Sequence, residues 1–237
     1  MKNRLLHLIT LGMLITVARP APAQESSMST TLTVGYDSRY VLYGYRLSRH
    51  LYHADVYLTK PINDKTSVWG GAWYGYLTDG TYHEVDVYGG VDRMLTETIS
   101  VGLAYSLFNY IEVPFETDDR ESEFAAHVSY FGEQLSLSLR EQYDTGAEGS
   151  LMRAIGGWSQ GVTEKFTVKA GAEVGYAFGY YIQGNLWNHA KLSLQTPYQI
   201  TDSVSLSPFI ARSIPLAAID DFEQYETIYG LSAAVSF

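Results

Sequence analysis

The 237-residue sequence contains no cysteine. This absence excludes disulfide bonds, zinc–thiolate sites and thiol nucleophiles. Basic residues are also few, with 16 Lys and Arg against 26 Asp and Glu and a net charge of −10. A chain this acidic is poorly suited to binding nucleic acid, so no nucleic-acid partner is expected.

Long hydrophobic runs are missing after residue 23, where no stretch approaches the roughly 20 apolar residues that a transmembrane helix needs. A polytopic helical membrane protein is therefore excluded, whereas a membrane β-barrel is not, because barrels cross the bilayer with short alternating strands. Apolar residues at helical spacing are missing as well, so we expect almost no helix.

One apolar run does occur at the N-terminus. Lys2 and Arg4 precede LLHLITLGMLITVA (5–18), and Ala21-Pro22-Ala23 follows as a small-x-small cleavage site. This order is typical of a secretory signal peptide, and the run is too short for a spanning anchor. We predict a cleaved signal peptide over 1–23 and an exported single domain over 24–237.

The rest of the chain is rich in alternating segments. In ISVGLAYSL (99–107), large apolar residues occupy every second position and small residues the positions between them, which is the period of a β-strand. Twelve strands are predicted, at about 30–45, 50–60, 66–77, 82–92, 99–110, 122–131, 134–144, 150–160, 165–177, 186–196, 203–213 and 224–237.

The connectors between these strands alternate in length and charge. Short turns such as PINDK (61–65) and MLTET (94–98) alternate with mostly longer, often acidic loops such as EVPFETDDRE (112–121). Outer-membrane barrels show this pattern, with the short turns in the periplasm. The predicted fold is an all-β, antiparallel, up-and-down transmembrane β-barrel of about 12 strands, with both termini in the periplasm.

The chain ends in the alternating segment YGLSAAVSF (229–237). A strand that closes a barrel against strand 1 would turn one row of this segment to lipid: Tyr229, Leu231, Ala233, Val235 and Phe237. An alternating ending with a terminal Phe also resembles the signal by which the outer-membrane assembly machinery recognises its barrels. We therefore predict that Tyr229, Leu231, Val235 and Phe237 form an assembly signal.

Three segments in the first half of the exported domain resemble a known family. DSRYVLYGYRLS (37–48) is similar to the "SDYxFRGxS" opening of the TorF-type porins, a group of proteobacterial outer-membrane proteins. EVDVYGGV (84–91) and VGLAYSLFNY (101–110) resemble two later strands of that family. The family's Arg-Gly pair is Tyr43-Gly44 here, with Arg46 two positions later. The resemblance implies an outer-membrane pore.

The strand parity opposite to the apolar rows predicts the residues that line the lumen. A β-bulge would reverse the parity locally. The charged residues predicted to line the pore are Asp37, Arg39, Asp55, Glu84, Asp86, Glu123, Arg140, Arg153, Lys169, Glu173 and Lys191. His53, Tyr57, Tyr88, His127, Gln142, His189 and Gln195 share this parity.

The predicted lumenal charges are segregated by sign. Asp55, Glu84 and Asp86 fall on early strands, whereas Arg140, Arg153, Lys169 and Lys191 fall on strands across a 12-strand ring. Facing acidic and basic walls predict a constriction that selects solutes by size and field. The alternative is that these side chains meet in salt bridges and plug the lumen, because 12 strands lie between the sizes of filled and open barrels.

The favoured function is a passive pore for small hydrophilic solutes, in contact with outer-membrane lipids and lipopolysaccharide. A non-conducting structural or adhesion barrel and a lipid-modifying enzyme are the alternatives. Lumenal histidines and serines occur, but no motif joins them with an acid, so no catalytic residue, metal or cofactor is assigned. The carboxylates of 112–121 could bind divalent cations shared with lipopolysaccharide, although a solvated loop is the simpler interpretation.

The mature protein should behave as a folded barrel in detergent, because a closed strand ring resists unfolding by detergent alone. In gel electrophoresis the unheated sample should run faster than the boiled one. A purified protein that remains monomeric and soluble without detergent would contradict the predicted fold.

Overall fold

The computed structural model describes residues 28–79, 83–111 and 120–237, and these residues form strands, turns and loops. The strands are β1 (Ser29–Asp37), β2 (Tyr40–Leu42), β3 (Tyr45–Ser48), β4 (Leu51–Asn63), β5 (Thr66–Leu77), β6 (His83–Met94), β7 (Ile99–Ile111), β8 (Arg120–Phe131), β9 (Leu135–Asp144), β10 (Gly149–Gly161), β11 (Thr167–Phe178), β12 (Asn185–Gln195), β13 (Tyr198–Gln199), β14 (Val204–Pro215) and β15 (Glu226–Ser236). No helix in this described part is long and apolar enough to cross a membrane.

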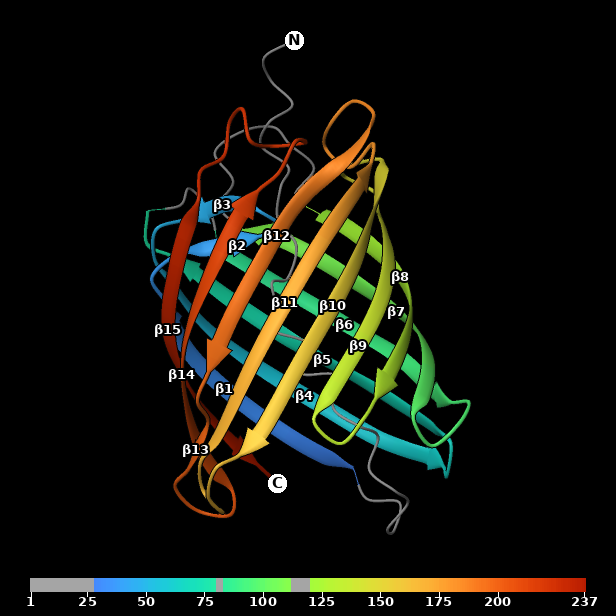
Figure 1. Cartoon of the computed structure of the whole chain (residues 1–237), viewed down its shortest axis with the longest axis vertical. Helices are drawn as coiled ribbons and strands as arrows, with labels where there is room; N and C mark the ends of the chain where they lie inside the picture. The colour runs from blue at the N-terminus through green and yellow to red at the C-terminus, as the bar shows by residue number, and fades with distance from the viewer. Residues whose placement is uncertain (1–27, 80–82, 112–119) are drawn as a thin grey trace.

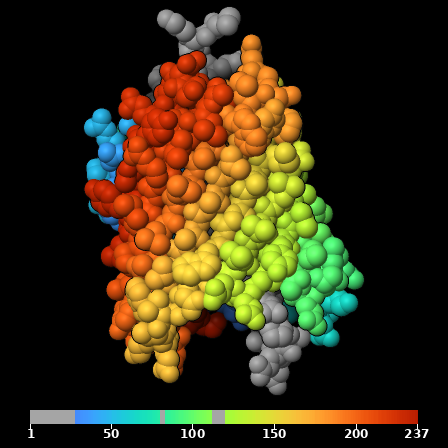
Figure 2. Space-filling view, in the orientation of Figure 1, coloured from blue at the N-terminus to red at the C-terminus, as the bar shows by residue number. Residues whose placement is uncertain are grey.

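Twelve long strands close into one antiparallel barrel (Figure 1). β1 pairs with β4, each strand from β4 to β11 pairs with the next, β12 pairs with β14, and β14 pairs with β15. The ring closes between β1 and β15, where Thr31 lies opposite Ser236 and Asp37 opposite Gly230. The predicted all-β fold with 12 barrel strands is confirmed. The strands facing the viewer in Figure 2 form a continuous wall.

The two faces of the wall differ because side chains alternate along each strand. On β9, Leu135, Leu137 and Leu139 point outward and remain about half exposed. Arg140 and Gln142 belong to the opposite face and are buried inside the ring. An apolar exterior and a polar interior are the arrangement that a lipid environment requires of a barrel.

The two ends of the barrel carry different connectors. The C-terminus and the turns that join β4 to β5, β6 to β7 and β8 to β9 lie at one end, here called the turn end (bottom of Figure 1). β1, β5, β7, β9, β11 and β14 end at the opposite end of the barrel, here called the loop end. Part of the predicted acidic loop 112–121 lies outside the described residues.

The predicted first strand over 30–45 is wrong in its second half. β1 ends at Asp37, and the chain then turns into a separate hairpin, β2 and β3, whose connection is Tyr43-Gly44. Both connecting residues have positive φ, 46° and 91°, as a two-residue type I′ turn requires. A Cβ on Gly44 would lie 2.5 Å from Ile219 Cδ1, so glycine is needed here for its size as well.

The terminal residue completes the ring. The backbone of Phe237 exchanges two hydrogen bonds with Thr30, at 2.9 Å from Phe237 N to Thr30 O and 3.2 Å in the opposite sense. Tyr229, Leu231 and Phe237 are exposed on the outer face, in the row predicted to meet lipid. Their role in assembly stays a prediction.

Deleting Phe237 should lower the amount of folded barrel, because it removes both backbone hydrogen bonds and the last apolar side chain of the closing strand. The measurement is the heat-modifiable band in the outer-membrane fraction. Phe237→Tyr is the matched control, since it keeps the backbone pair and an aromatic ring. Equal levels of the deletion variant and the parent would remove the assembly role.

Candidate functional site in the barrel lumen

The β2–β3 hairpin fills the lumen near the loop end (Figure 1). Tyr40, Leu42, Tyr43 and Tyr45 are at most 6% exposed. They belong to one buried cluster with side chains from around the ring: Leu51, Trp73, Leu77, Tyr88, Phe108, Tyr110, Leu151, Ala177, Tyr180, Ala218 and Ile219. Because these partners come from opposite walls, the hairpin lies across the lumen rather than against one side.

Ionic contacts hold the edges of the hairpin. Arg46 Nη1 lies 2.8 Å from Glu226 Oε1, and Arg39 Nε lies 3.5 Å from Glu226 Oε2. Glu226 is the first residue of β15. The hairpin is therefore tied to the strand that closes the barrel.

A second anchor lies in the loop after β5. The hydroxyl of Ser48 and the backbone amide of Arg49 both donate to Asp79 Oδ1. Partial burial opposes ionisation, but these hydrogen bonds outweigh it and lower the pKa of the Asp79 carboxyl. Because the folded-state pKa is lowered, this contact is intact near neutral pH and is lost as the pH falls through that pKa.

A polar network runs along the wall from β8 to β12. Glu123 accepts hydrogen bonds from Arg140 Nη2 at 2.9 Å and from Gln142 Nε2 at 2.7 Å. Arg153 Nε donates to Gln142 Oε1 at 3.0 Å, and Arg153 Nη1 lies 3.4 Å from Glu173 Oε1. Each buried arginine is thus compensated by a carboxylate on its own wall.

The same network reaches the hairpin at two points. The guanidinium of Arg153 lies over the ring of Tyr43, 4.5 Å from its centroid, in a cation–π contact. His189 lies 2.9 Å from Glu173 and 2.7 Å from Asn188, and Asn188 Nδ2 lies 3.4 Å from the hydroxyl of Tyr45. Wall and hairpin are therefore one hydrogen-bonded unit.

The acidic residues of β6 lie on the other side of the hairpin. Glu84 and Asp86 have no solvent exposure, and the Tyr40 hydroxyl donates to Glu84 Oε2 at 3.2 Å. Neither forms an ion pair with another described residue, and the two carboxyl groups interact with each other. The acidic wall therefore lacks the compensation that the arginine-bearing wall has.

Toward the turn end the lumenal side chains are partly exposed. Asp92 lies 2.9 Å from His127, and the Tyr88 hydroxyl donates to Asp55 at 2.7 Å. The pair of Asp37 and His53, 3.7 Å apart, lies instead near the loop end, where β1 ends. Lys169 and Lys191 form no ion pair with any residue in the described ranges. The half of the lumen toward the turn end is a polar cup below the hairpin.

Ten of the eleven predicted pore-lining residues lie on inward-facing strand positions: Asp37, Asp55, Glu84, Asp86, Glu123, Arg140, Arg153, Lys169, Glu173 and Lys191. Arg39 follows β1 and contacts Glu226. The prediction of an acidic wall facing a basic wall needs a change, because the basic wall also carries carboxylates: Arg140 and Arg153 are paired with Glu123 and Glu173. The pore-lining role of these residues stays a proposal.

Several lumenal residues escaped the sequence reasoning. Asn188 was excluded by parity, but a bulge between β11 and β12 shifts the register and buries it beside His189. Asp92, Asp144 and Glu226 lie near strand ends, where alternation gives the weakest signal. The predicted strands 82–92, 134–144 and 224–237 already contain these three residues, so their inward parity could have been read from the sequence.

The lumenal histidines pair with carboxylates or an amide, and no serine hydroxyl is hydrogen-bonded to a histidine ring among the described residues. The described residues also contain no group of three or more His, Asp or Glu side chains arranged to hold a metal ion. The chemistry visible here is charge pairing and hydrogen bonding.

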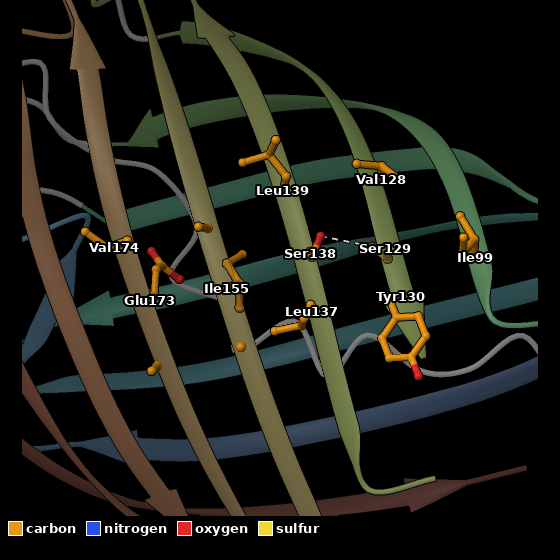
Figure 3. A pocket seen from close by; sticks show the side chains of 13 residues that line it. Ile99, Val128, Ser129, Tyr130, Leu137, Ser138, Leu139, Ile155, Glu173 and Val174 are labelled. Atoms are coloured by element: carbon orange, nitrogen blue, oxygen red, sulfur yellow. Dashed lines mark hydrogen bonds between the residues drawn. The ribbon is translucent and has the colours of Figure 1, made fainter. Parts of the chain in front are cut away.

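A hollow of about 590 Å³ lies on the wall of β7–β11, away from the hairpin (Figure 3). Leu137, Leu139, Val128 and Tyr130 border it from the apolar outer face. Between Leu137 and Leu139, Ser138 hydrogen-bonds Ser129 at 2.9 Å. The lining of this hollow is mostly apolar and also includes Ser129, Ser138 and Glu173.

Replacing Arg153 should destabilise the barrel, because Arg153→Met leaves Glu173 with less compensation and removes the contact with Tyr43. The expected loss is about 3 kcal/mol in the free energy of unfolding, measured by urea titration of the folded band in lipid vesicles. Arg212→Met, at an exposed position of β14, is the control. Arg153→Met/Glu173→Gln should recover part of the loss, and a single variant as stable as the parent would contradict the role given to the network.

The chain matches no protein-family model and no curated protein sequence. Among solved structures, it is similar to the COG4313 outer membrane channel from Pseudomonas putida F1, with a TM-score of 0.58, 10% identity, and coverage of 97% of this chain and 100% of that one. The KdgM porin gives a TM-score of 0.54, 10% identity and coverage of 88% and 99%. The NanC porin gives 0.55, 12% identity and coverage of 87% and 98%. The chain therefore has the fold of porin-like outer-membrane barrels.

Proposed function

We propose that this protein is a passive outer-membrane pore for small hydrophilic solutes. The observation that carries the proposal is the inner face of a closed barrel, which is lined by charged residues from Asp37 to Lys191 while the outer face is apolar. A barrel that served only as a membrane anchor would need no such polar cup. The similarity to porin and channel structures supports the same function.

The proposal includes the route to the membrane. The signal peptide over 1–23 directs export, and the assembly machinery recognises the closing strand ending at Phe237. Outer-membrane lipids then surround the apolar band and lipopolysaccharide surrounds the loop end. No catalytic step is part of this function.

In the proposed pore the β2–β3 hairpin is the constriction. The cup at the turn end is partly exposed, whereas the level of Tyr43 and Tyr45 is packed with buried side chains. Solute passage therefore requires the hairpin to move. The contacts of the hairpin with Glu226 and Asp79 are ionic or partly exposed. Water can replace such polar contacts more readily than it can replace apolar packing.

The proposed family is the TorF-type porins. The two segments that carry most of the resemblance, 37–48 and 84–91, meet in the lumen, where Tyr40 of the first donates to Glu84 of the second. If members of the family share this contact between hairpin and wall, the contact would explain why both motifs occur together.

Single-channel recording tests the pore and its constriction together. Asp37 and Leu51 are register partners, so residues 38–50 can be replaced by an Asn-Gly turn without straining β1 or β4. The trimmed variant should conduct more than the parent, because the side chains that cross the lumen are gone. The measurement is conductance in planar bilayers.

The control shortens the β6–β7 turn at the opposite end, where residues 95–98 do not contact the hairpin. This change should leave conductance at the parental value. If neither the parent nor the trimmed variant conducts, the pore function is wrong and the barrel is structural.

A further inference from the structure

The arginines near the lumen are already paired with carboxylates. Arg39 and Arg46 share Glu226, Arg140 pairs with Glu123 and Arg153 pairs with Glu173. A cation with an anion in contact leaves little field for a passing ion, because the two charges nearly cancel beyond a few ångströms. Arg140 and Arg153 therefore contribute little attraction for anions, and Arg46, which shares Glu226 with Arg39, also lies beside Glu223.

Four lumenal carboxylates have no basic partner among the described residues: Asp55, Glu84, Asp86 and Asp144. Asp55 is bonded to a tyrosine, and Asp144 accepts from the amides of Gly146 and Ala147 at 2.8 Å. Asp86 is fully buried and interacts with the carboxyl group of Glu84 rather than with a cation. Burying an ionised carboxylate without a cation beside it is energetically unfavourable. A cation that reached this wall would therefore be stabilised there.

The lysines do not balance this surplus. Lys191 is the register partner of Glu173, whose carboxylate already compensates Arg153. Lys169 lies close to the turn end, where the lumen is partly exposed and water weakens its field. Lys191 therefore stays unpaired on the wall opposite β6, but two lysines face four carboxylates that lack a cation, so negative charge remains in excess.

We infer that the pore selects cations and uncharged solutes over anions, and that Glu84 and Asp86 set this selectivity; the inference rests on the proposed pore function. Both residues lie behind Tyr40, at the level where the hairpin narrows the lumen. When the hairpin moves, water reaches the two carboxyl groups, and the negative charge that they then carry lines a confined path. Carboxylates in such a space favour cations and repel anions.

The solute class follows from the same geometry. Small organic and inorganic cations fit a path whose unpaired charges are mostly negative, and neutral hydrophilic molecules meet no barrier of charge. Polyanionic solutes would have to pass Glu84 and Asp86 without an unpaired arginine to bind them. The field should weaken with salt, because the screening length falls from about 10 Å at 0.1 M to about 3 Å at 1 M.

Reversal potentials in a KCl gradient test this inference, using the parent protein and the variant with 38–50 replaced by Asn-Gly. Both should prefer K⁺ over Cl⁻ at low salt, and the preference should shrink as salt rises. Glu84→Gln/Asp86→Asn should move the reversal potential toward zero, since the amides keep the shape and remove the charge. The single variant Glu84→Gln should give a smaller shift of the reversal potential. It provides the test if the double variant folds poorly.

The matched control is Glu97→Gln/Asp202→Asn, which removes the same charge from exposed turns at the turn end. It should leave selectivity unchanged. A channel that conducts but prefers Cl⁻, or a K⁺ preference that survives the loss of Glu84 and Asp86 charge, would overturn this inference and leave the pore intact. Absence of conductance in both proteins would overturn the pore function and this inference with it.

Discussion

A closed ring of strands leaves each side chain only two directions, outward to lipid or inward to the lumen. The whole molecule depends on this constraint. Outward positions such as Leu137 and Leu231 need no partner beyond an apolar solvent. Inward positions bring Arg140, Arg153, Glu123 and their neighbours into a space too narrow for bulk water, so each charge must find compensation within the ring or stay in the wetter cup.

Some buried charges are paired with a charge on the neighbouring strand, whereas others are paired with a residue of the hairpin that is far away in the sequence. Glu123 and Arg140 lie on adjacent strands, and so do Arg153 and Glu173. Glu226 instead meets Arg46, 180 residues earlier in the chain. Both kinds of pair serve the same requirement, but only the second fixes the position of a segment that is not part of the wall.

The sequence predicts the wall well because wall residues obey a period of two. The predicted strand 66–77 coincides with β5, and 99–110 misses only the last residue of β7. Inward parity on β6, β9, β10 and β11 follows from the same rule. Alternation depends only on neighbours along the strand, so it can be read without knowing which strands pair.

The hairpin and the bulge could not be predicted in the same way. YVLYGYR alternates like a wall strand, and only Gly44 hints at the turn that the positive φ of Tyr43 completes. An apolar row on a barrel strand normally faces lipid, whereas the tyrosines of this hairpin are buried inside the lumen. Asn188 faces inward because the register shifts between β11 and β12, which depends on pairing and not on the residue itself.

The contact between Arg46 and Glu226 bears on the order of folding. The hairpin follows the first strand of the ring, but its partners include β6, β10, β12 and the start of the last strand. These partners exist in one place only after β15 has paired with β1. Contacts of such large sequence separation form late and slowly. The complete set of hairpin contacts therefore requires a closed ring, and a fully docked hairpin marks a ring that has already closed.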